Sequence, residues 1–162
     1  MNAIYFDYYE SPIGLIEVAG TETAVIGLNF VTDRCLEIAS NPLVAGTVRQ
    51  VAEYFEDNRR DFEIETVFDG TDFQQQVWRQ LRTVPYGCTA SYQDIARGVG
   101  RPRAVRAVGA ANGRNPITII VPCHRIIGKN GKLVGYGSGL WRKEWLLRHE
   151  GCPIFGPAAD KQ

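Results

Sequence analysis

One short stretch carries residue types that could do covalent chemistry: Pro122-Cys123-His124-Arg125, inside the apolar run of residues 117–127. Cysteine is nucleophilic as the thiolate, and cationic neighbours lower the pKa of a thiol. A histidine and an arginine follow Cys123 directly. Taken alone, the stretch fits two interpretations about equally well. One is a reactive thiol, and the other is a buried structural cysteine, the commonest kind of free cysteine.

The chemistry open to Cys123 depends on where the neighbouring imidazole lies. Adjacent residues in an extended segment point to opposite sides, so His124 is poorly placed to hydrogen-bond the thiol directly. A bridging water could close that gap. A cysteine hydrolase would need a histidine in direct contact and an oxyanion hole, and this adjacent pair does not suggest that geometry.

The composition fits one domain, or two small ones that share an interface. The 162 residues are 44% hydrophobic and include three tryptophans, so a core can form. No apolar run is long enough to span a membrane, and the first residues lack the basic start of a signal peptide. The four cysteines lack CxxC spacing and there are only two histidines. We therefore expect reduced thiols in a cytoplasmic protein, without zinc.

The charge is divided between the two halves of the chain. Residues 1–70 hold four basic and thirteen acidic residues, a net charge of −9, whereas residues 71–162 hold fourteen basic and five acidic residues, a net charge of +9. A strongly basic half favours a polyanionic partner, most often nucleic acid. The alternative is two solvated faces that differ in charge without such a partner.

The first 70 residues predict an antiparallel sheet and one helix. Short apolar stretches at residues 4–10, 15–19 and 24–30 are separated by turns, which is typical of meandering strands. Pro42 opens a helical pattern that continues to Phe55, and the alternation in residues 62–68 predicts another strand. No group of residues with catalytic chemistry occurs here, so we expect a scaffold.

The second half predicts short helices around the cysteine stretch. A domain boundary is expected at residues 69–72, which gives domains 1–70 and 71–162. A helix capped by Thr71 or Asp72 should run to Leu81, and a last helix should cover residues 141–150. Between them, residues 91–98 and a helix with Pro102 as its first residue are joined by a glycine-containing turn, which makes a helix-turn-helix candidate.

The second helix of this pair has an unusually bare surface. Arg106 is the long side chain amid small ones, which are Ala104, Ala107, Gly109, Ala110 and Ala111. A thin helix can enter the DNA minor groove, which is only ~6 Å wide. Small residues equally permit close packing against another element, and the spacing alone leaves both interpretations open.

The motifs of the second half resemble the O6-alkylguanine-DNA alkyltransferases. The matching segments are residues 121–127, Arg106-Ala107-Val108-Gly109, Asn115-Pro116, residues 143–147 and His149-Glu150-Gly151. The resemblance is dense from about Thr71 to Gly151, and the spacing of several separate motifs makes it specific. It implies an α/β (α+β) fold. An N-terminal ribonuclease-H-like domain, with an antiparallel sheet plus a helix, would precede a mostly helical winged helix-turn-helix domain that carries the cysteine.

The function that this resemblance implies is DNA repair by a protein that acts once. The protein would bind double-stranded DNA through its helix-turn-helix, flip an O6-alkylguanine out of the stack, and keep the alkyl group on its own cysteine. O4-alkylthymine is a second candidate lesion. A thioether has no leaving group that water could displace under mild conditions, so the protein would not turn over. The resemblance implies no cofactor, no membrane, and a monomer that can cluster on DNA.

The resemblance also implies roles for residues at matching positions. Cys123 would be the acceptor, and His124, oriented by Glu150, would contact its thiol through a water. Arg106 would fill the space left by the flipped base. The remaining catalytic positions are the pocket lysine, the asparagine between the DNA-reading helix and the active-site strand, and the tyrosine that crowds the target phosphate and hydrogen-bonds the base: Lys143, Asn115 and Tyr92.

Further positions would contact the base or the DNA. The pocket for the flipped base would be lined by Tyr136, Gly137 and Ser138, and additional DNA contacts would come from Gln93, Arg101 and Lys129, beside Tyr92. The family often has two glycines where this chain has Ser138-Gly139, so the extra hydroxymethyl group could narrow the pocket. The zinc-binding residues of some members have no counterpart here.

Two other functions compete with transfer. A DNA-binding module without chemistry could be a regulator or a non-catalytic alkyltransferase-like sensor of damage. In those sensors the reactive cysteine is replaced, whereas Cys123 is present here. A cysteine hydrolase would leave the basic helix-turn-helix without a role.

Overall fold

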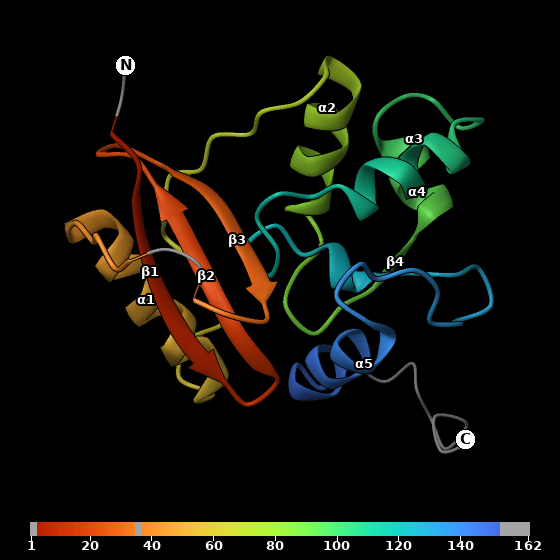
Figure 1. Cartoon of the computed structure of the whole chain (residues 1–162). Helices are drawn as coiled ribbons and strands as arrows, with labels where there is room; N and C mark the ends of the chain where they lie inside the picture. The colour runs from red at the N-terminus through yellow and green to blue at the C-terminus, as the bar shows by residue number, and fades with distance from the viewer. Residues whose placement is uncertain (1–2, 35–36, 153–162) are drawn as a thin grey trace. The chain divides into compact units, whose positions relative to one another are not determined.

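The computed structural model describes residues 3–34 and 37–152, which form two compact units (Figure 1). The first unit contains the described residues up to Asp69 together with Pro116–Ile120. The second contains Gly70–Asn115 and the described residues from Val121 onward. The domain boundary expected at residues 69–72 remains a proposal, to which the structure adds that five residues of the second half pack with the first unit.

The first unit is built on a three-stranded antiparallel sheet in the order β1-β2-β3. Its strands are β1 (Tyr5–Ser11), β2 (Gly14–Gly20) and β3 (Val25–Val31), close to the three predicted stretches. Tyr8 lies opposite Glu17, and its hydroxyl donates to Glu17 Oε2 over 2.7 Å. Ile16, Val18 and Leu28 are fully buried, so alternate positions of the central and edge strands supply the core.

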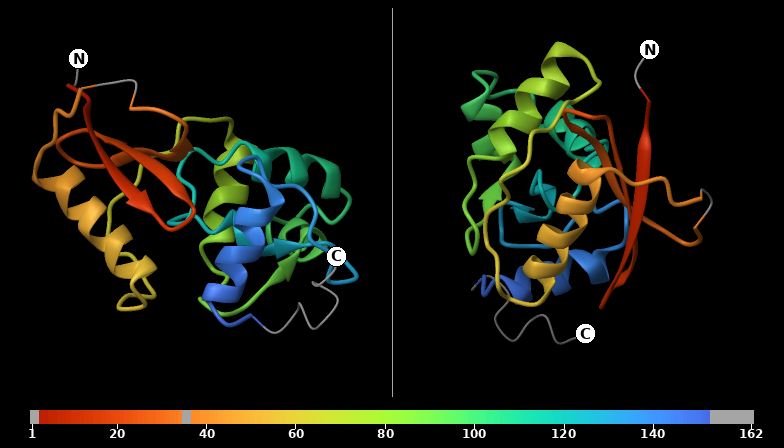
Figure 2. Two further views of the ribbon diagram at one scale, coloured as in Figure 1. Left: turned by 60° about the horizontal axis from the view of Figure 1, so that its bottom comes forward. Right: turned by 90° about the vertical axis from the view of Figure 1, so that its left-hand side faces the viewer.

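Helix α1 (Pro42–Phe55) packs against this sheet, as Figure 2 shows. The Asn41 side chain caps the helix by accepting from the Val44 N–H over 2.8 Å, and Pro42 occupies the first turn, where its missing N–H has no cost. Val44, Val51 and Tyr54 recur at helical spacing and are fully buried. The helix predicted from Pro42 to Phe55 is therefore confirmed.

The strand predicted at residues 62–68 is wrong. This segment makes only an isolated bridge, between Thr66 and Val25. Two contacts explain why it does not extend. The Gln50 side chain donates to Glu63 O over 3.4 Å and accepts from the Glu63 N–H over 3.0 Å. Further along β3, Leu28 bridges to Ile117 instead. The alternation reflects half-buried side chains rather than a ladder of hydrogen bonds.

The second unit contains helices α2 (Asp72–Leu81), α3 (Tyr92–Gly98), α4 (Val105–Gly113) and α5 (Leu140–His149). Strands β4 (Ala90–Ser91) and β5 (Ile126–Ile127) form a short parallel pair. Capping boxes start α2 and α3: Thr71 pairs with Gln74, and Ser91 pairs with Asp94. Helices α2, α3 and α4 pack together, as Figure 1 shows.

The helix-turn-helix pair is present, but its second helix starts later than predicted. Pro102 lies in a turn, and α4 begins at Val105. The turn is closed by a hydrogen bond from the Ala104 N–H to Arg101 O over 2.9 Å. The Gln93 side chain also donates to Pro102 O over 2.8 Å. These contacts satisfy the backbone hydrogen-bonding groups of the turn, so the helix begins only after it.

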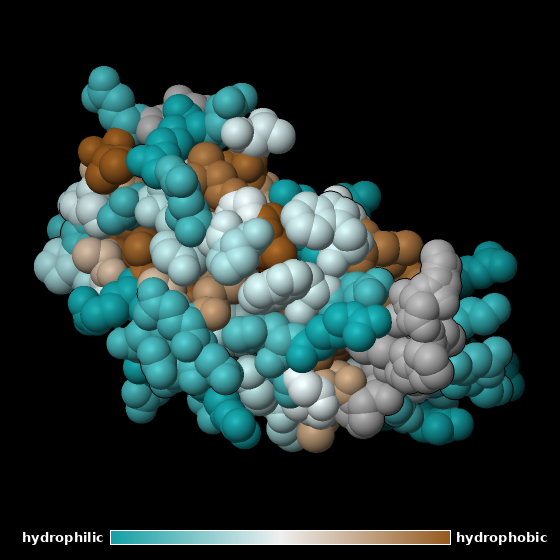
Figure 3. Space-filling view, turned by 90° about the horizontal axis from the view of Figure 1, so that it is seen from below, coloured by the Kyte–Doolittle hydropathy of each residue, from teal (hydrophilic) through white to brown (hydrophobic). Residues whose placement is uncertain are grey.

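The exposed surface carries few large apolar side chains. On the face drawn in Figure 3, hydrophilic residues predominate and hydrophobic ones lie in small groups. Among the described residues, the large hydrophobic side chains that are well exposed are Ile4, Ile38, Val67, Val134, Leu140 and Trp141. Over the same residues, every helix is too short or too polar to traverse a bilayer.

Candidate active site

Cys123 is held in a tight turn rather than in the extended segment predicted from its apolar flanks. It is the first residue of the 3₁₀ helix η1 (Cys123–Arg125), and it is 3% exposed. Pro122 has φ −81° and ψ 65°, which is the inverse γ-turn conformation, and the Cys123 N–H donates to Val121 O over 2.8 Å. Proline favours this turn because its ring fixes φ near this value.

The pKa of the Cys123 thiol is set by opposing effects. Burial raises it above its ordinary value, whereas Asn115, Lys143 and Tyr136 lower it. The cation that acts on the thiol is therefore Lys143 of α5, not the adjacent Arg125 as expected. The arginine side chain is turned toward other groups. A buried thiol of this kind is protonated until a base removes its proton.

Glu150, the residue after α5, joins the two residues that follow the cysteine. Its Oε2 lies 2.7 Å from His124 Nε2. Arg125 Nε donates to Glu150 Oε1 over 2.8 Å, and Arg125 Nη1 donates to Val84 O over 2.7 Å. Burial alone would raise the pKa of Glu150, but His124 and Arg125 hold it well below its ordinary value. The structure thus places Glu150 against His124, as the resemblance implied.

The His124 imidazole is neutral and oriented. Burial lowers its pKa more than the nearby carboxylate of Glu150 raises it. Because an ionised carboxylate can only accept, the ring proton belongs on Nε2. This leaves Nδ1 as an acceptor, and among the described residues it has no hydrogen-bond partner. The adjacent thiol is the group that an acceptor at this place could deprotonate through a water.

Lys143 and Tyr92 converge on one backbone segment. Lys143 Nζ donates to Val134 O over 2.9 Å and to Gly135 O over 3.3 Å, and the Tyr92 hydroxyl donates to Val134 O over 2.9 Å. Lys143 is fully buried, and this burial lowers its pKa to about 8, against a raising effect of Cys123. These two side chains therefore fix the loop that leads to Tyr136.

The three residues expected in the base pocket occupy that loop. The Tyr136 hydroxyl is buried without a hydrogen-bond partner among the described residues, and Tyr136 is one of the groups that lower the pKa of the Cys123 thiol. Gly137 lies near the end of α4, and the Ser138 carbonyl accepts from Arg142 over 2.6 Å. Of the pair Ser138-Gly139, position 139 requires glycine, because its φ is 108°.

The residues expected to contact DNA are distributed over the helix-turn-helix and a turn. Arg106 is exposed on α4 together with Ala107 and Ala110, so these small residues do not pack inward, whereas Ala111 does. Arg101 and Lys129 are also exposed, and the Arg101 guanidinium lies over the Phe73 ring at 5.6 Å. The Gln93 amide is instead bound to the turn before α4.

Two residues near the cysteine make contacts that were not predicted from the sequence. Asn112 is 5% exposed and donates from Nδ2 to Cys123 O over 3.4 Å. Arg125 supports Glu150 rather than the thiol. For Asn112 the available signal was a polar residue on the buried face of an otherwise Ala/Val helix. For Arg125 it was an arginine inside an apolar run, which must be paired where it is buried.

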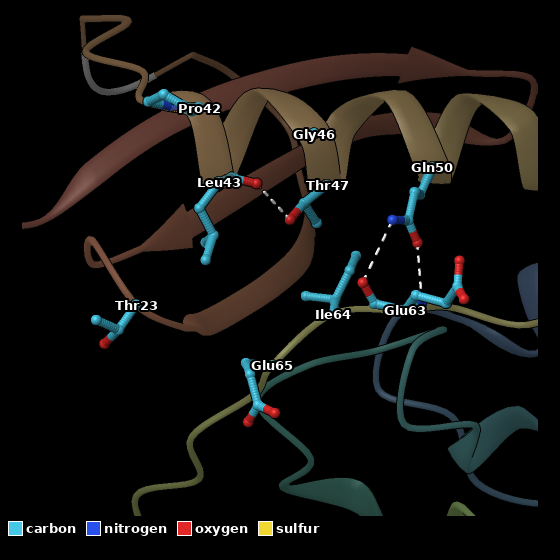
Figure 4. Close-up of a pocket in the computed structure, with 9 residues that line it drawn as sticks. All are labelled: Thr23, Pro42, Leu43, Gly46, Thr47, Gln50, Glu63, Ile64 and Glu65. Carbon is cyan, nitrogen blue, oxygen red and sulfur yellow. Dashed lines mark hydrogen bonds between the residues drawn. The ribbon is translucent and has the colours of Figure 1, made fainter.

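A separate pocket of about 270 Å³ lies in the first unit, between α1 and residues 63–65 (Figure 4). Gln50 closes one side through its two hydrogen bonds to Glu63. Thr47 is buried, and its hydroxyl donates to Leu43 O over 2.8 Å. The polar side chains of this wall are thus engaged with backbone, whereas the arrangement that can do covalent chemistry surrounds Cys123.

Comparison with known families matches both halves of the chain. Residues 4–68 match the ribonuclease-like domain of 6-O-methylguanine DNA methyltransferase, and residues 72–152 match its DNA binding domain. A methylated-DNA–protein-cysteine methyltransferase of Methanosarcina acetivorans is 46% identical over 156 residues, which cover 91% of this chain and 99% of that protein. Its namesake in Mycolicibacterium paratuberculosis is 49% identical over 147 residues, covering 87% and 88%.

Solved structures give the same comparison in three dimensions. The crystal structure of Mycobacterium tuberculosis O6-methylguanine methyltransferase matches with a TM-score of 0.82 and 44% identity, over 91% of this chain and 93% of that chain. The M. tuberculosis protein in complex with DNA matches with a TM-score of 0.83 and 46% identity, over 90% and 91%. These similarities confirm the α/β fold expected from the sequence.

Proposed function

The chain belongs to the 6-O-methylguanine DNA methyltransferase family, and from this membership we propose that it removes alkyl groups from O6-alkylguanine in double-stranded DNA and keeps them on Cys123. Cys123 is assigned as the acceptor because its thiol is buried beside a neutral histidine that the Glu150 carboxylate orients. Transfer is favoured over the non-catalytic sensor because the reactive cysteine is present and the relatives are named as methyltransferases.

The proposed reaction uses the resting arrangement of the site. His124 Nδ1 accepts the thiol proton through a water, and Glu150 stabilises the imidazolium that forms. The Cys123 thiolate attacks the alkyl carbon, the S–C bond forms, and the bond from that carbon to O6 breaks. The electron pair of the broken bond stays with the guanine, which remains in the DNA. The guanine takes up one proton, which balances the proton lost by the thiol. The thioether product stays on the protein.

The role of the remaining site residues follows from their positions. Lys143 and Tyr92 would hold the loop that presents Tyr136, Gly137 and Ser138 to the flipped base. Asn115 would connect the region after α4 to the turn before Cys123, since Asn115 Nδ2 donates to Val121 O over 2.7 Å. The proposal includes a monomeric, cytoplasmic protein, with O4-alkylthymine as a second lesion and clustering along DNA.

Intact mass after incubation with O6-methylguanine duplex tests this function. The expected result is a stoichiometric gain of one methyl group per protein, and no further consumption of lesion. An unchanged mass together with tight binding to the lesion would favour the sensor. Repeated turnover would favour a hydrolase.

Binding to DNA should weaken steeply with salt and depend little on sequence. Exposed cations of the second unit, among them Arg101, Arg103 and Lys129, would contact phosphates and release counterions. The logarithm of the affinity should then fall against the logarithm of the salt concentration, with a slope of about −0.9 for each phosphate contact. Titrations of undamaged duplexes at several salt concentrations measure this slope. A flat line, or a strong preference for one undamaged sequence, would contradict the proposal.

Replacing Arg106 with alanine should slow repair of duplex DNA about tenfold or more, with little effect on the reaction with free O6-alkylated guanine base. Arg106 projects from the exposed Ala/Gly face of α4, where it could occupy the space that the flipped base leaves. Flipping costs a few kcal/mol, and only the duplex reaction includes it. Single-turnover rates on both substrates, measured beside the affinity for undamaged duplex, test this expectation.

Arg103→Ala is the matched control, because Arg103 is another exposed arginine, located just before α4. As an ordinary phosphate contact it should weaken binding to all duplexes alike and make the salt slope shallower by ~1. If Arg106→Ala behaved in the same way, or reduced the free-base reaction equally, Arg106 would not be the residue that replaces the flipped base.

A further inference from the structure

Helix α4 carries one polar side chain on its buried face. That face consists of Val108, Ala111 and Asn112, and Asn112 is 5% exposed. Burying an amide is unfavourable unless hydrogen bonds replace those it makes with water. The contacts of Asn112 therefore indicate what its amide group does at this place.

The amide of Asn112 donates to the carbonyl of the proposed nucleophile itself, with Nδ2 3.4 Å from Cys123 O. Asn115 makes the corresponding bond on the other side, to Val121 O over 2.7 Å. Each carbonyl also accepts a backbone bond: Val121 O from the Cys123 N–H, and Cys123 O from the Ile126 N–H. The carbonyl groups of Val121 and Cys123, which flank Pro122, are thus held by one asparagine in the last turn of α4 and one just after that helix.

The other half of the Asn112 amide is unused. Its Oδ1 is buried and has no partner among the described residues. Within that same part of the chain, the other buried side-chain polar atoms in this condition are His124 Nδ1 and the Tyr136 hydroxyl. An unpaired acceptor destabilises the fold, and an apolar residue at this position would avoid that loss. Unpaired groups of this kind call for a functional explanation.

We infer that Asn112 is a positioning residue of the transfer reaction, which fixes the Cys123 carbonyl, and with it the first turn of η1, relative to α4. This inference rests on the proposed function, because it assigns Asn112 a part in transfer to Cys123. A leucine would fill a similar volume but lose both the donor and the unpaired acceptor. An aspartate would keep the shape, lose the donor, and bring a negative charge close to the forming thiolate.

The test compares Asn112→Leu and Asn112→Asp with Val108→Ala, a change on the same buried face that leaves the Cys123 carbonyl untouched. Three quantities are measured: the single-turnover rate with free O6-alkylated guanine base, the pH profile of Cys123 alkylation by iodoacetamide located by peptide mapping, and the thermal midpoint. Asn112→Leu should keep or raise the midpoint yet transfer about tenfold more slowly, as expected for one lost hydrogen bond.

Asn112→Asp should be slower still, and its alkylation profile should shift toward alkaline pH because a nearby negative charge raises the pKa of a thiol. Val108→Ala should lower the midpoint without moving the profile, since its effect is a cavity. Transfer by Asn112→Leu at the wild-type rate with the wild-type profile would overturn the inference. So would losses of rate that follow the midpoint in all three variants. Wild-type protein that gained no alkyl group would instead overturn the proposed function, and the inference with it.

Discussion

Replacing Cys123 with alanine should abolish alkyl transfer while leaving the affinity for undamaged duplex unchanged. In the proposed reaction the new bond forms to the sulfur atom of Cys123, so no other residue of the site can replace this cysteine. In the proposed function, binding depends on the exposed face of α4 and its flanking turns, which do not include Cys123. Intact mass and duplex titration of the same preparation measure the two properties together.

The other described cysteines provide the control for this expectation. Cys88 is exposed, whereas Cys152 is buried, and its pKa is raised to about 11 by burial and by Glu150. Cys88→Ser should therefore transfer at the wild-type rate, because an exposed thiol outside the pocket cannot reach the alkyl carbon of a bound base. Peptide mapping that located the alkyl group on Cys88 or Cys152 would remove Cys123 from its role.

The elements that could be predicted from the sequence are those whose signals are local. Helix α1 has its cap at Asn41 and its buried stripe in one continuous stretch, and the capping boxes of α2 and α3 are also visible as residue spacing. Strands β1 to β3 are short apolar stretches with close turns. In each case the residues that decide the structure lie within a few positions of one another.

The predictions that were wrong involve partners distant in sequence. Residues 62–68 alternate like a strand, but β3 bridges there only at Thr66, and Gln50 binds the backbone of Glu63. The start of α4 depends on the Gln93 side chain, nine residues before Pro102. The turn at Cys123 is the exception, because its cause is local: the conformation of Pro122 closes an inverse γ-turn where β-branched neighbours suggested extended backbone.

For the candidate site, the sequence and the family resemblance predicted contacts between side chains better than contacts of side chains with backbone. The pairing of His124 with Glu150 was expected from matching positions, and the structure places the two 2.7 Å apart. The convergence of Tyr92 and Lys143 on Val134 O was not foreseeable, because a backbone carbonyl has no signature in the sequence. For the same reason, the contact between Asn112 and Cys123 O could not be predicted from the sequence.

The network around Glu150 should make the fold sensitive to acid. The pKa of Glu150 in the folded protein lies below its ordinary value of 4.5, so its contribution to stability is present above that pH and is lost as the pH falls. The pKa of His124 is likewise lowered from 6.5, mainly by burial, so protonation below about pH 6.5 favours the unfolded chain. Both shifts have the same sign, and each predicts lower stability toward acid pH.

Replacing Glu150 with glutamine should therefore destabilise the protein by about 3–5 kcal/mol at neutral pH, because Arg125 keeps its buried charge and loses its partner. Transfer should also slow, since a neutral amide cannot stabilise the imidazolium form of His124. The difference in the free energy of unfolding between wild type and variant should shrink as the pH falls below 4.5, where the wild-type carboxylate loses its advantage. Denaturant titrations at several pH values measure this difference.

Glu144→Gln, within the helix that Glu150 directly follows, is the matched control. Glu144 pairs with Arg148 over 2.9 Å, but their side chains are 35% and 49% exposed. A solvent-exposed pair of this spacing contributes only about 0.3–0.5 kcal/mol, so the control should change stability little at any pH. A similar loss in both variants would mean that removing any negative charge from α5 or from the residue after it has this effect. A Glu150 variant as stable as wild type would show that the charge of Arg125 is compensated by Val84 O and other groups, and that Glu150 does not hold this part of the site together.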